Sequence, residues 1–497
     1  MCLAARAVAP PPPPAGLHPP LRQRMYEFDE FDQPEDGQAD GLRDLVESYE
    51  RDLTEGRGSW FDSEALESVA AFYFEAGRID EALSVVDRQL DDSPFQSDGW
   101  LRRGVLLNHL DRHDEALSSY DRALSLNPAD SEVLVNRGIT LDALGRVEEA
   151  METYQRALQL DPLAVDALFN RGIAQEKLGR YQDAADSFIR CTEIDPDHPE
   201  AWYELGYCYD QLERLDDSLG CYDRQIDLDP FAQNAWYNRG IVLNRLGRYD
   251  DAVSSYDFAT AIQEDFASAW YNRGNALANL GATDRAIESY LRVLDFEDGD
   301  AATFYNLGLA YEELEDYETA VSYLRRAVED DAAYADAWYG LGCCLDGLHR
   351  SDEALDALAR ALALDPDVGE YWHARADAEY NAGRLSEAAA SYARVVALEP
   401  DNADAWLDLA ETRREAGMAE ASLEAYAQLI RLQPESSEAH LRQAEAFAIA
   451  GQRESAVRSL RRACELDPAR SEEIRRAHPE LLGGTRAGEP PRAEERS

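Results

Sequence analysis

The sequence predicts an all-α solenoid of about twelve helix-turn-helix repeats of 34 residues each, and two patterns lead to this prediction. The first is a lattice of large side chains spaced by 34 residues or a multiple of 34. Seven of the eight tryptophans lie on it: Trp100, Trp202, Trp236, Trp270, Trp338, Trp372 and Trp406. The other lattice points hold Leu66, Leu134, Leu168, Phe304 and His440, so the period runs through residues 63–470 without an insertion or deletion. A fixed period of this length is typical of repeat architectures.

The second pattern is helical spacing of apolar residues within each repeat. Trp236, Ile241, Leu243 and Leu246 form one such stripe, which another helix must cover. Small residues such as Gly240 and Ala252 stand where two helix backbones would approach closely. We expect Trp236 to fill the space beside them, and its truncation to cost roughly 3–5 kcal/mol.

Glycine and proline mark the expected ends of the two helices in each repeat. Position 15, counted from the first residue of a repeat, is glycine in eight repeats: Gly77, Gly145, Gly179, Gly247, Gly281, Gly383, Gly417 and Gly451. A first helix that ends in a left-handed residue explains this choice. Position 32 is proline in nine repeats: Pro94, Pro128, Pro162, Pro196, Pro230, Pro366, Pro400, Pro434 and Pro468. Proline restricts the preceding residue away from helix, so we expect looser stacking where Glu264, Asp298 and Ala332 replace it.

These marks give the chain a family resemblance. Residues 97–130 carry Trp100, Gly104, Ala116, Tyr120, Ala123 and Pro128 at positions 4, 8, 20, 24, 27 and 32. This pattern closely resembles the tetratricopeptide repeat (TPR) family, with repeats starting at residues 63, 97, 131, 165, 199, 233, 267, 301, 335, 369, 403 and 437. The resemblance implies a right-handed α-solenoid superhelix whose first helices line a concave groove for a peptide or protein.

By the same resemblance, positions 5 and 6 face that groove. Position 5 gives an aromatic ladder of Phe169, Tyr203, Tyr237, Tyr271, Tyr305 and Tyr339. Position 6 gives Asn136, Asn170, Asn238, Asn272 and Asn306, interrupted by Glu204. Asparagine offers a donor and an acceptor, so spaced asparagines can hold an extended peptide backbone, and a similar ladder lines the repeats of O-linked N-acetylglucosamine transferases. The alternative is that these residues are ordinary repeat chemistry with no ligand.

The charges that the groove would carry favour a basic or polar ligand. Position 2 is acidic at Asp98, Glu132, Asp166, Glu200, Asp336, Glu370, Asp404 and Glu438. A carboxylate clamp of the chaperone type needs basic groove residues, whereas Lys177 is the only lysine in the chain. We expect the arginines at position 7 to form ion pairs with neighbouring acids: Arg103, Arg137, Arg171, Arg239, Arg273 and Arg375. Nucleic acid is disfavoured, because phosphate neutralisation needs a basic surface.

Composition favours a salt-rich, reducing cytoplasm. The 99 acidic and 48 basic residues give a net charge of −51, and such self-repulsion is relieved when molar salt shortens the screening length to roughly 3 Å. We therefore interpret the chain as halophilic; the alternative is an acidic solenoid from an ordinary high-GC bacterium. The seven cysteines are odd in number and form no metal or disulfide pattern. Cys191, Cys208 and Cys221 are interpreted as small buried hydrophobes.

The flanks differ from the repeats. Residues 1–41 are expected to be disordered, and residues 1–24, which lack any acid, suggest that translation starts at Met25. Residues 42–62 are expected to form a helix at 42–53 followed by a linker. Residues 471–482 are expected to form a capping helix with the polar residues Glu472, Glu473, Arg475 and Arg476. Residues 483–497 are expected to be a disordered tail. No apolar stretch of about 18 residues predicts a membrane span.

The sequence thus predicts a monomeric, non-enzymatic scaffold for a protein or peptide, with no catalytic, metal or cofactor residues. The flanks are too short for a catalytic domain. His109 and His113 are four residues apart, but Asp111 between them ends the first helix, which disfavours a shared metal. Two alternatives stay open: a self-assembling structural element, and the non-catalytic regulatory subunit of an enzyme complex.

Overall fold

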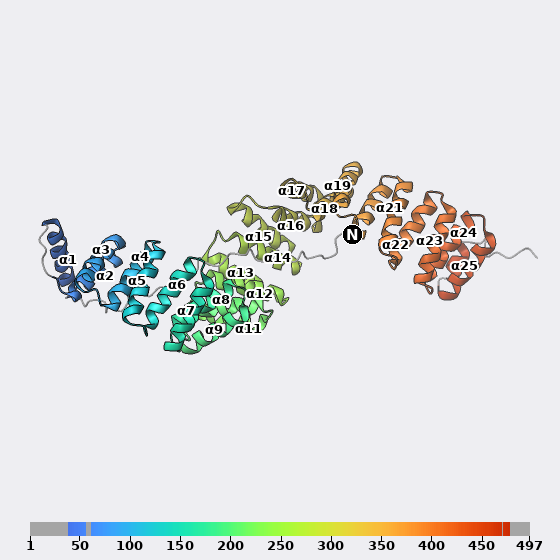
Figure 1. Ribbon diagram of the computed structural model, residues 1–497. Helices are drawn as coiled ribbons and strands as arrows, with labels where there is room; N and C mark the ends of the chain where they lie inside the picture. The colour runs from blue at the N-terminus through green and yellow to red at the C-terminus, as the bar shows by residue number, and fades with distance from the viewer. Residues whose placement is uncertain (1–37, 56–60, 470, 478–497) are drawn as a thin grey trace, which may run out of the picture. The chain divides into compact units, whose positions relative to one another are not determined.

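The computed structural model describes residues 38–55, 61–469 and 471–477, and within these ranges the chain is helical with no strand (Figure 1). The all-α prediction is therefore confirmed. Two compact units divide the chain, and the boundary between Asn272 and Arg273 falls inside one helix. We call the part up to Asn272 the N-terminal unit and the part from Arg273 the C-terminal unit. Residues 1–37 and 483–497, which were expected to be disordered, and residues 478–482 of the expected capping helix lie outside the described residues. Residues 38–41 were also expected to be disordered, but they are helical.

In the N-terminal unit a single helix precedes a series of helix pairs. Helix α1, Gln38–Glu55, is longer than the expected 42–53. The pairs are α2 (Ser63–Glu75) with α3 (Ile79–Asp92), α4 (Ser97–His109) with α5 (His113–Leu126), α6 (Ser131–Ala143) with α7 (Val147–Leu160), α8 (Val165–Lys177) with α9 (Tyr181–Ile194), α10 (Ala201–Gln211) with α11 (Leu215–Leu228), and α12 (Gln233–Arg245) with α13 (Tyr249–Ile262). Each pair corresponds to one 34-residue repeat. Helix α14, Ala267–Asn279, contains the boundary between the units.

The C-terminal unit continues the same alternation and ends in a short helix. Its helices are α15 (Thr283–Phe296), α16 (Ala301–Glu313), α17 (Tyr317–Asp330), α18 (Ala335–Gly347), α19 (Ser351–Leu364), α20 (Gly369–Asn381), α21 (Leu385–Leu398), α22 (Ala403–Glu415), α23 (Ala419–Leu432), α24 (Ser437–Ile449), α25 (Arg453–Leu466) and α26 (Ser471–Ala477). Helix pairs α2–α3 to α24–α25 make up the predicted twelve repeats.

Every first helix ends in the same left-handed turn. The eight predicted glycines at position 15 have φ between 69° and 75°. The other four repeats place Asp111, Glu213, Glu315 and His349 at that position with φ of 57–59°. A left-handed backbone costs a residue with a Cβ roughly 1–2 kcal/mol. The repeat geometry therefore keeps this turn even where the sequence lacks the residue that favours it.

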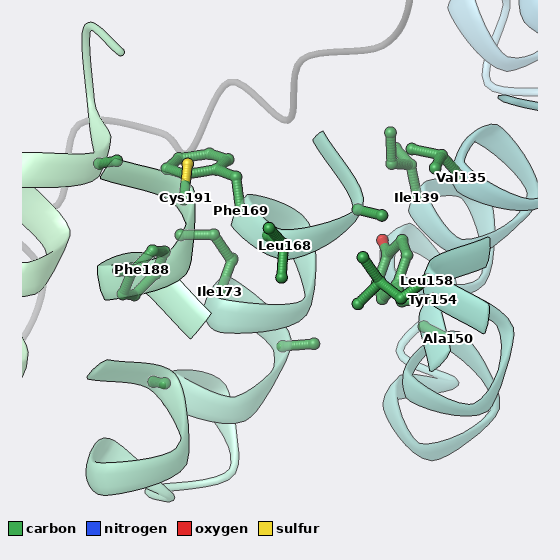
Figure 2. Packing of buried hydrophobic residues seen from close by; sticks show 14 of the residues in the cluster. Val135, Ile139, Ala150, Tyr154, Leu158, Leu168, Phe169, Ile173, Phe188 and Cys191 are labelled. Carbon is green, nitrogen blue, oxygen red and sulfur yellow. The ribbon is translucent and has the colours of Figure 1, made fainter. Parts of the chain in front are cut away.

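Close helix contact within a pair requires a small residue at position 8. A Cβ added to Gly240 would lie 2.5 Å from Tyr256 Cε1, and one added to Gly172 would lie 2.5 Å from Phe188 Cε1. Figure 2 shows part of this core, where Phe188 gathers with Phe169, Ile173 and Cys191. The predicted close approach of the two helix backbones is confirmed.

The position-4 tryptophans join successive repeats through a hydrogen bond. The indole Nε1 donates to the position-32 carbonyl of the preceding repeat at Trp100, Trp202, Trp236, Trp270, Trp338, Trp372 and Trp406, over 2.8–3.1 Å. Glu264 and Ala332 accept this bond as the prolines do, so losing proline does not remove the bond. At Asp298 the partner is Phe304, which cannot donate. The indoles are half-buried, and the expected cost of truncating them stays a prediction.

Arginines at position 7 form a second link in the N-terminal unit. Arg239 Nε donates to Asp223 of the preceding repeat at 2.6 Å, and its Nη1 donates to Ser255 of its own repeat at 2.7 Å. The same bridge, from position 7 to positions 25 and 23, joins Arg103 to Asp87 and Ser119, Arg137 to Asp121 and Thr153, and Arg171 to Gln155 and Ser187. The predicted ion pairs are confirmed for Arg103, Arg137 and Arg239, and also for Arg375, which pairs with Glu379 at 2.8 Å.

Both ends of the helical array are covered by a helix. In α1, Val46 and Tyr49 are buried in the same core as Leu66. In α26, Ile474 is buried against Leu460 and Ala463, while Glu472 and Glu473 are exposed. Residues 471–477 are thus helical, and the capping role of the expected helix stays a prediction.

Candidate functional site

The predicted ladder residues lie on the first helices of the pairs, and neighbouring first helices contact one another. We call the side of these helices that carries positions 5 and 6 the first-helix face; in the N-terminal unit it runs over α4, α6, α8, α10, α12 and the part of α14 up to Asn272. Asn238 Nδ2 donates to the hydroxyl of Tyr203 at 2.8 Å, and Asn272 Nδ2 donates to the hydroxyl of Tyr237 at 3.0 Å. Position 5 of one repeat therefore meets position 6 of the next, which brings predicted residues of both ladders together.

The same contact occurs with other side chains outside the ladder. Glu67 pairs with Arg102 in the first two repeats, and His373 contacts Asp408 at 3.2 Å in the C-terminal unit. These pairs also stand 35 residues apart. The meeting of positions 5 and 6 is thus a property of the repeat geometry, and each junction fills it with its own chemistry.

The aromatic ladder belongs mostly to the core. Phe169, Tyr203, Tyr237, Tyr305 and Tyr339 are buried, and Tyr271 is half-buried. Their rings pack against the position-34 residue of their own repeat in three cases: Phe169 with His198 at 4.7 Å, Tyr237 with Phe266 at 4.8 Å, and Tyr305 with Tyr334 at 4.9 Å between centroids. Burial raises the pKa of Tyr237 to about 12, so this phenol stays neutral and keeps its hydrogen bond.

The asparagines divide into two kinds. Asn136 and Asn170 are 0% and 1% exposed, and each donates Nδ2 to a carbonyl of its own helix, that of Glu132 or of Asp166. Asn306 donates to Asn275 Oδ1 at 3.1 Å.

Asn238 and Asn272 are half-buried and commit their Nδ2 donors as described above. Within the described part of the chain, no hydrogen bond reaches the Oδ1 of either residue. These two residues therefore keep an acceptor for a ligand.

Glu204 interrupts the asparagine ladder with a buried acid that meets a second acid. It is 3% exposed and shares a hydrogen bond with Glu176 of α8. Burial raises the pKa of Glu176 to about 7, with the charge of Lys177 acting in the opposite direction. Burial, together with Glu176 and Glu200, raises the pKa of Glu204 well above its ordinary value. Sequence reasoning missed this pair, although an acid within a run of asparagines is a readable signal.

A polar ladder that sequence reasoning missed joins positions 12 and 13. Lys177 Nζ contacts Asp142 at 2.6 Å, Arg245 pairs with Asp210, and Asn381 Nδ2 donates to Asp346 at 2.8 Å. Each donor stands 35 residues after its acceptor. Lys177, the one lysine considered for a carboxylate clamp, is therefore already bound to an acid.

In the C-terminal unit, the repeat that starts at residue 369 carries a histidine, His373, at position 5. His373 lies 3.3 Å from Asp377 and 3.2 Å from Asp408, and hydrogen bonds to these carboxylates raise its pKa to about 10. Tyr392 donates to Asp377 as well, and Tyr371 donates to Asp336 at 2.5 Å. This region therefore holds a charged imidazolium between two acids at neutral pH.

Other candidate groups have ordinary structural partners. Among the described residues, no three His, Cys, Asp or Glu side chains gather in a way that could hold a metal ion. His113 Nδ1 lies 2.7 Å from Asn108 Oδ1, and the His109 ring packs against Phe74. The described cysteines are free thiols, and Cys191, Cys208 and Cys221 are buried. Of the helices that the structure describes, none is long and apolar enough to cross a membrane.

Comparison with protein families finds repeats along most of the array. Models described as tetratricopeptide repeat match residues 97–130 and 165–198, 119–152 and 188–220, 211–263 and 237–302, and 312–378 and 380–444. A model described as TPR repeat matches residues 141–179. Their boundaries at 97, 130, 165 and 198 coincide with those of the 34-residue period.

Comparison with solved structures finds several matches to repeat proteins. The TPR protein YrrB, described as having an unusual peptide-binding site, is 23% identical, with 37% of this chain and 95% of that chain covered and a TM-score of 0.35. A tetratricopeptide repeat protein from Parabacteroides merdae is 20% identical over 50% of this chain and 98% of that chain, with a TM-score of 0.36. The C-terminal part of a TPR protein from Cytophaga hutchinsonii is 15% identical over 48% and 98%, with a TM-score of 0.43. No curated protein matches the sequence.

Proposed function

We propose, from the premise that the chain belongs to the tetratricopeptide repeat family, that it is a non-enzymatic scaffold binding a peptide or protein on its first-helix face. One observation carries the proposal. Asn238 and Asn272 occupy the same position in adjacent repeats, and each keeps its Oδ1 acceptor while its donor is fixed on a tyrosine. The tyrosines thereby orient both amides, which reduces the ordering cost of binding.

Spaced acceptors of this kind suit an extended peptide. Backbone N–H groups of a peptide can donate to Oδ1 whatever side chains the peptide carries. The buried aromatic ladder supports this surface from below, since Tyr203 and Tyr237 hold the two asparagines. We retain Asn136, Asn170, Phe169 and Tyr271 in the proposed site as its continuation within the N-terminal unit, with Asn238 and Asn272 as the direct contacts. Asn306, Tyr305 and Tyr339 belong to the C-terminal unit and are proposed as a separate part of the ladder.

The charge of the first-helix face favours a basic or polar partner. Asp98 is exposed at position 2 in the N-terminal unit, and Glu132, Asp166 and Glu200 are half-buried there. Lys177 is already paired with Asp142, so it offers little to an acidic ligand. A partner with Lys or Arg beside its extended segment would gain from this field.

The experiment is a binding comparison on an array of extended peptides of varied charge, with the full-length protein in molar KCl. We expect Asn238→Ala/Asn272→Ala to lose peptide binding. The matched control is Tyr203→Phe/Tyr237→Phe, which removes the same two hydrogen bonds between repeats but leaves both amide oxygens in place. Because the tyrosines orient the amides, we expect this control to bind more weakly than wild type but more tightly than the alanine variant. An equal loss in both variants, or no loss in either, would contradict the role given to the acceptors. Asn136→Ala/Asn170→Ala reports whether the buried asparagines take part.

We further propose that the protein works in a salt-rich cytoplasm as a monomer. The net charge of −51 supports this, because molar salt screens repulsion between the many acids. Unfolding midpoints in a KCl series test the point, and no rise in midpoint between low and molar KCl would contradict it.

The alternative function is self-assembly into a structural element. The exposed acids of α26 oppose end-to-end stacking, since a polar outer face is typical of a capping helix. Light scattering at molar KCl decides between the two. A mass that rises with protein concentration would favour assembly, whereas a constant monomer mass would exclude it.

A further inference from the structure

A hollow at one junction of the N-terminal unit lies outside the first-helix face. The unit has five junctions between successive 34-residue repeats, and an arginine bridge spans four of them. The fifth joins residues 165–198 to residues 199–232. We call it the apolar junction, because Leu205, Ile189 and Cys221 stand where the other junctions carry the arginine, its partner from the preceding repeat, and a hydroxyl.

The three replacements are matched to one another. The bridge needs all three positions, since the arginine donates to both of the others. At the apolar junction no member of the bridge is left unpaired, so the exchange leaves no buried charge without a partner. Losing the long arginine side chain, however, leaves its space empty.

The space is a hollow of about 390 Å³, which is within the range of ligand pockets. Leu205, Ile189, Cys221 and Trp202 line it, together with Gly220 of α11. Gly220 is exposed, and a Cβ added there would meet nothing within 4 Å. The other repeats of this unit carry Ser84, Ser118, Glu152, Asp186 or Ser254 at that position. The glycine therefore keeps the hollow open from the side of α11.

Acids surround the apolar lining. Glu193, Asp216 and Asp217 lie at the hollow and are exposed. Arg214 pairs with Asp217 at 2.7 Å, whereas Glu193 and Asp216 form no ion pair within the described residues. A ligand that fills the apolar space would therefore place its flanking groups in a negative field.

We propose that the apolar junction is a second binding site, which takes one large aliphatic or aromatic side chain from a polypeptide partner with Lys or Arg on either side of it. The apolar lining accepts the side chain, and Glu193 and Asp216 attract the flanking cations. A second copy of this chain fits poorly, because its net charge of −51 would be repelled. An anionic lipid surface is disfavoured for the same reason.

The test uses full-length protein and fluorescein-labelled peptides of the sequence Gly-Lys-Arg-Phe-Arg-Lys-Gly, at the lowest KCl concentration that keeps the fold. Fluorescence anisotropy measures the affinity. We expect replacement of Phe by Ala in the peptide to weaken binding at least tenfold. Replacement of the four basic residues by Glu should abolish binding, and added KCl should weaken binding of the basic peptide.

Two protein variants locate the site. Ile189→Asp/Leu205→Arg/Cys221→Ser installs the bridge of the other four junctions, and we expect it to fold and to bind at least tenfold more weakly. Gly220→Leu should block the hollow, whereas Gly220→Ala adds one methyl group and should bind like wild type. Equal affinity of wild type, the triple variant and Gly220→Leu would overturn the proposal.

Two further outcomes are informative. Asn238→Ala/Asn272→Ala should leave this peptide's affinity unchanged, which separates the apolar junction from the first-helix face. The rival occupant is the chain's own residues 1–24, which contain Arg6, Arg22 and Arg24 and no acid. Peptide binding that appears only after these arginines are changed to Glu would show that this segment fills the hollow and would overturn the assignment to a separate partner.

Discussion

In the N-terminal unit an arginine bridge joins the repeats at four of five junctions. The C-terminal unit keeps the same 34-residue repeat length without this bridge. Position 25 there carries Leu291, Arg325, Ala359, Ala393 and Ala427, none of which can accept from an arginine. Position 7 is Leu307, Leu341 and Leu409 at three of its junctions. Arg375 remains, but it pairs with Glu379 of its own helix. The comparison shows that the stacking of repeats tolerates either polar or apolar junctions.

The two units also differ in what they bury on the first helices. The N-terminal unit buries the acid pair Glu176 and Glu204, and the C-terminal unit buries much of His373 between two carboxylates. In both, one residue departs from the ladder pattern of its neighbours. Each departure creates a titratable group whose pKa differs from its ordinary value, so the two units should respond to pH in separate windows.

The largest change in the free energy of unfolding is expected for Glu204→Gln in the N-terminal unit. In the unfolded chain both acids ionise near pH 4.5, but in the folded chain the pKa of Glu176 is about 7. The folded state therefore holds protons that the unfolded state has lost, and stability falls as pH rises from about 4.5 to 7. Burial disfavours the charged form of Glu204, so we expect the variant to be more stable than wild type at pH 8 and little changed at pH 4. Amide hydrogen exchange in each unit measures this, and an equal gain at both pH values would contradict it.

Gly240→Ala probes the close contact within a helix pair of the N-terminal unit. The new Cβ would lie 2.5 Å from a carbon of the Tyr256 ring, and overpacking of this kind costs roughly 1–3 kcal/mol. Gly220→Ala is the matched control, because its Cβ meets open space and a helical glycine costs roughly 1 kcal/mol relative to alanine. Opposite signs are expected in urea unfolding, and the same sign in both would count against the packing argument.

Arg239→Leu tests whether the arginine bridge contributes to stability where its partners stay polar. The variant leaves Asp223 and Ser255 without their donor, and we expect a loss of about 1–2 kcal/mol. Arg248→Leu removes an ion pair with Asp251 that is about half exposed on both sides, so its cost should be at most about 0.5 kcal/mol. A similar cost for both variants would show that the bridge adds nothing beyond a surface pair.

Glu315→Gly tests the left-handed turn in the C-terminal unit. Glu315 has φ of 59° at position 15, where most repeats carry glycine. Relief of the Cβ clash should raise stability by about 0.5–1 kcal/mol, partly offset by the greater freedom of glycine in the unfolded chain. Thermal unfolding measures the gain, and a loss of stability would mean that the Glu315 side chain makes a contact worth more than the turn.

The smallest change in the free energy of unfolding is expected at His373. Its side chain is 35% exposed, and solvent screens its ion pairs. Its pKa is raised from 6.5 to about 10, so its contribution is complete below pH 6.5 and disappears as pH rises through 10. His373→Gln should therefore lose more stability relative to wild type at pH 6 than at a pH above 10. A stability difference that is constant across this range would contradict the ion pairs with Asp377 and Asp408.

The sequence predicted those features of the fold that one repeat can specify by itself. Glycine at position 15 and the small residue at position 8 act within a helix pair, so their spacing was enough to place them. The contacts of Asn238 with Tyr203 and of Arg239 with Asp223 join different repeats, and only the angle between helix pairs shows that positions 5 and 6, or 7 and 25, meet. The hollow at Leu205 was harder still to predict from the sequence, because it arises where the arginine bridge is absent and its three positions are far apart in the chain.

The tryptophan hydrogen bonds also make tryptophan fluorescence a probe of the turns between repeats. Each of the seven indoles bonds to a carbonyl six residues earlier, in the turn that connects two repeats. A rearrangement of that turn that breaks the bond would change the polarity around the indole and so its fluorescence emission. Four junctions have Leu134, Leu168, Phe304 or His440 at position 4 in place of tryptophan, so they give no tryptophan fluorescence signal. A single retained tryptophan, with the others changed to phenylalanine, would follow the turn between one chosen pair of repeats in real time.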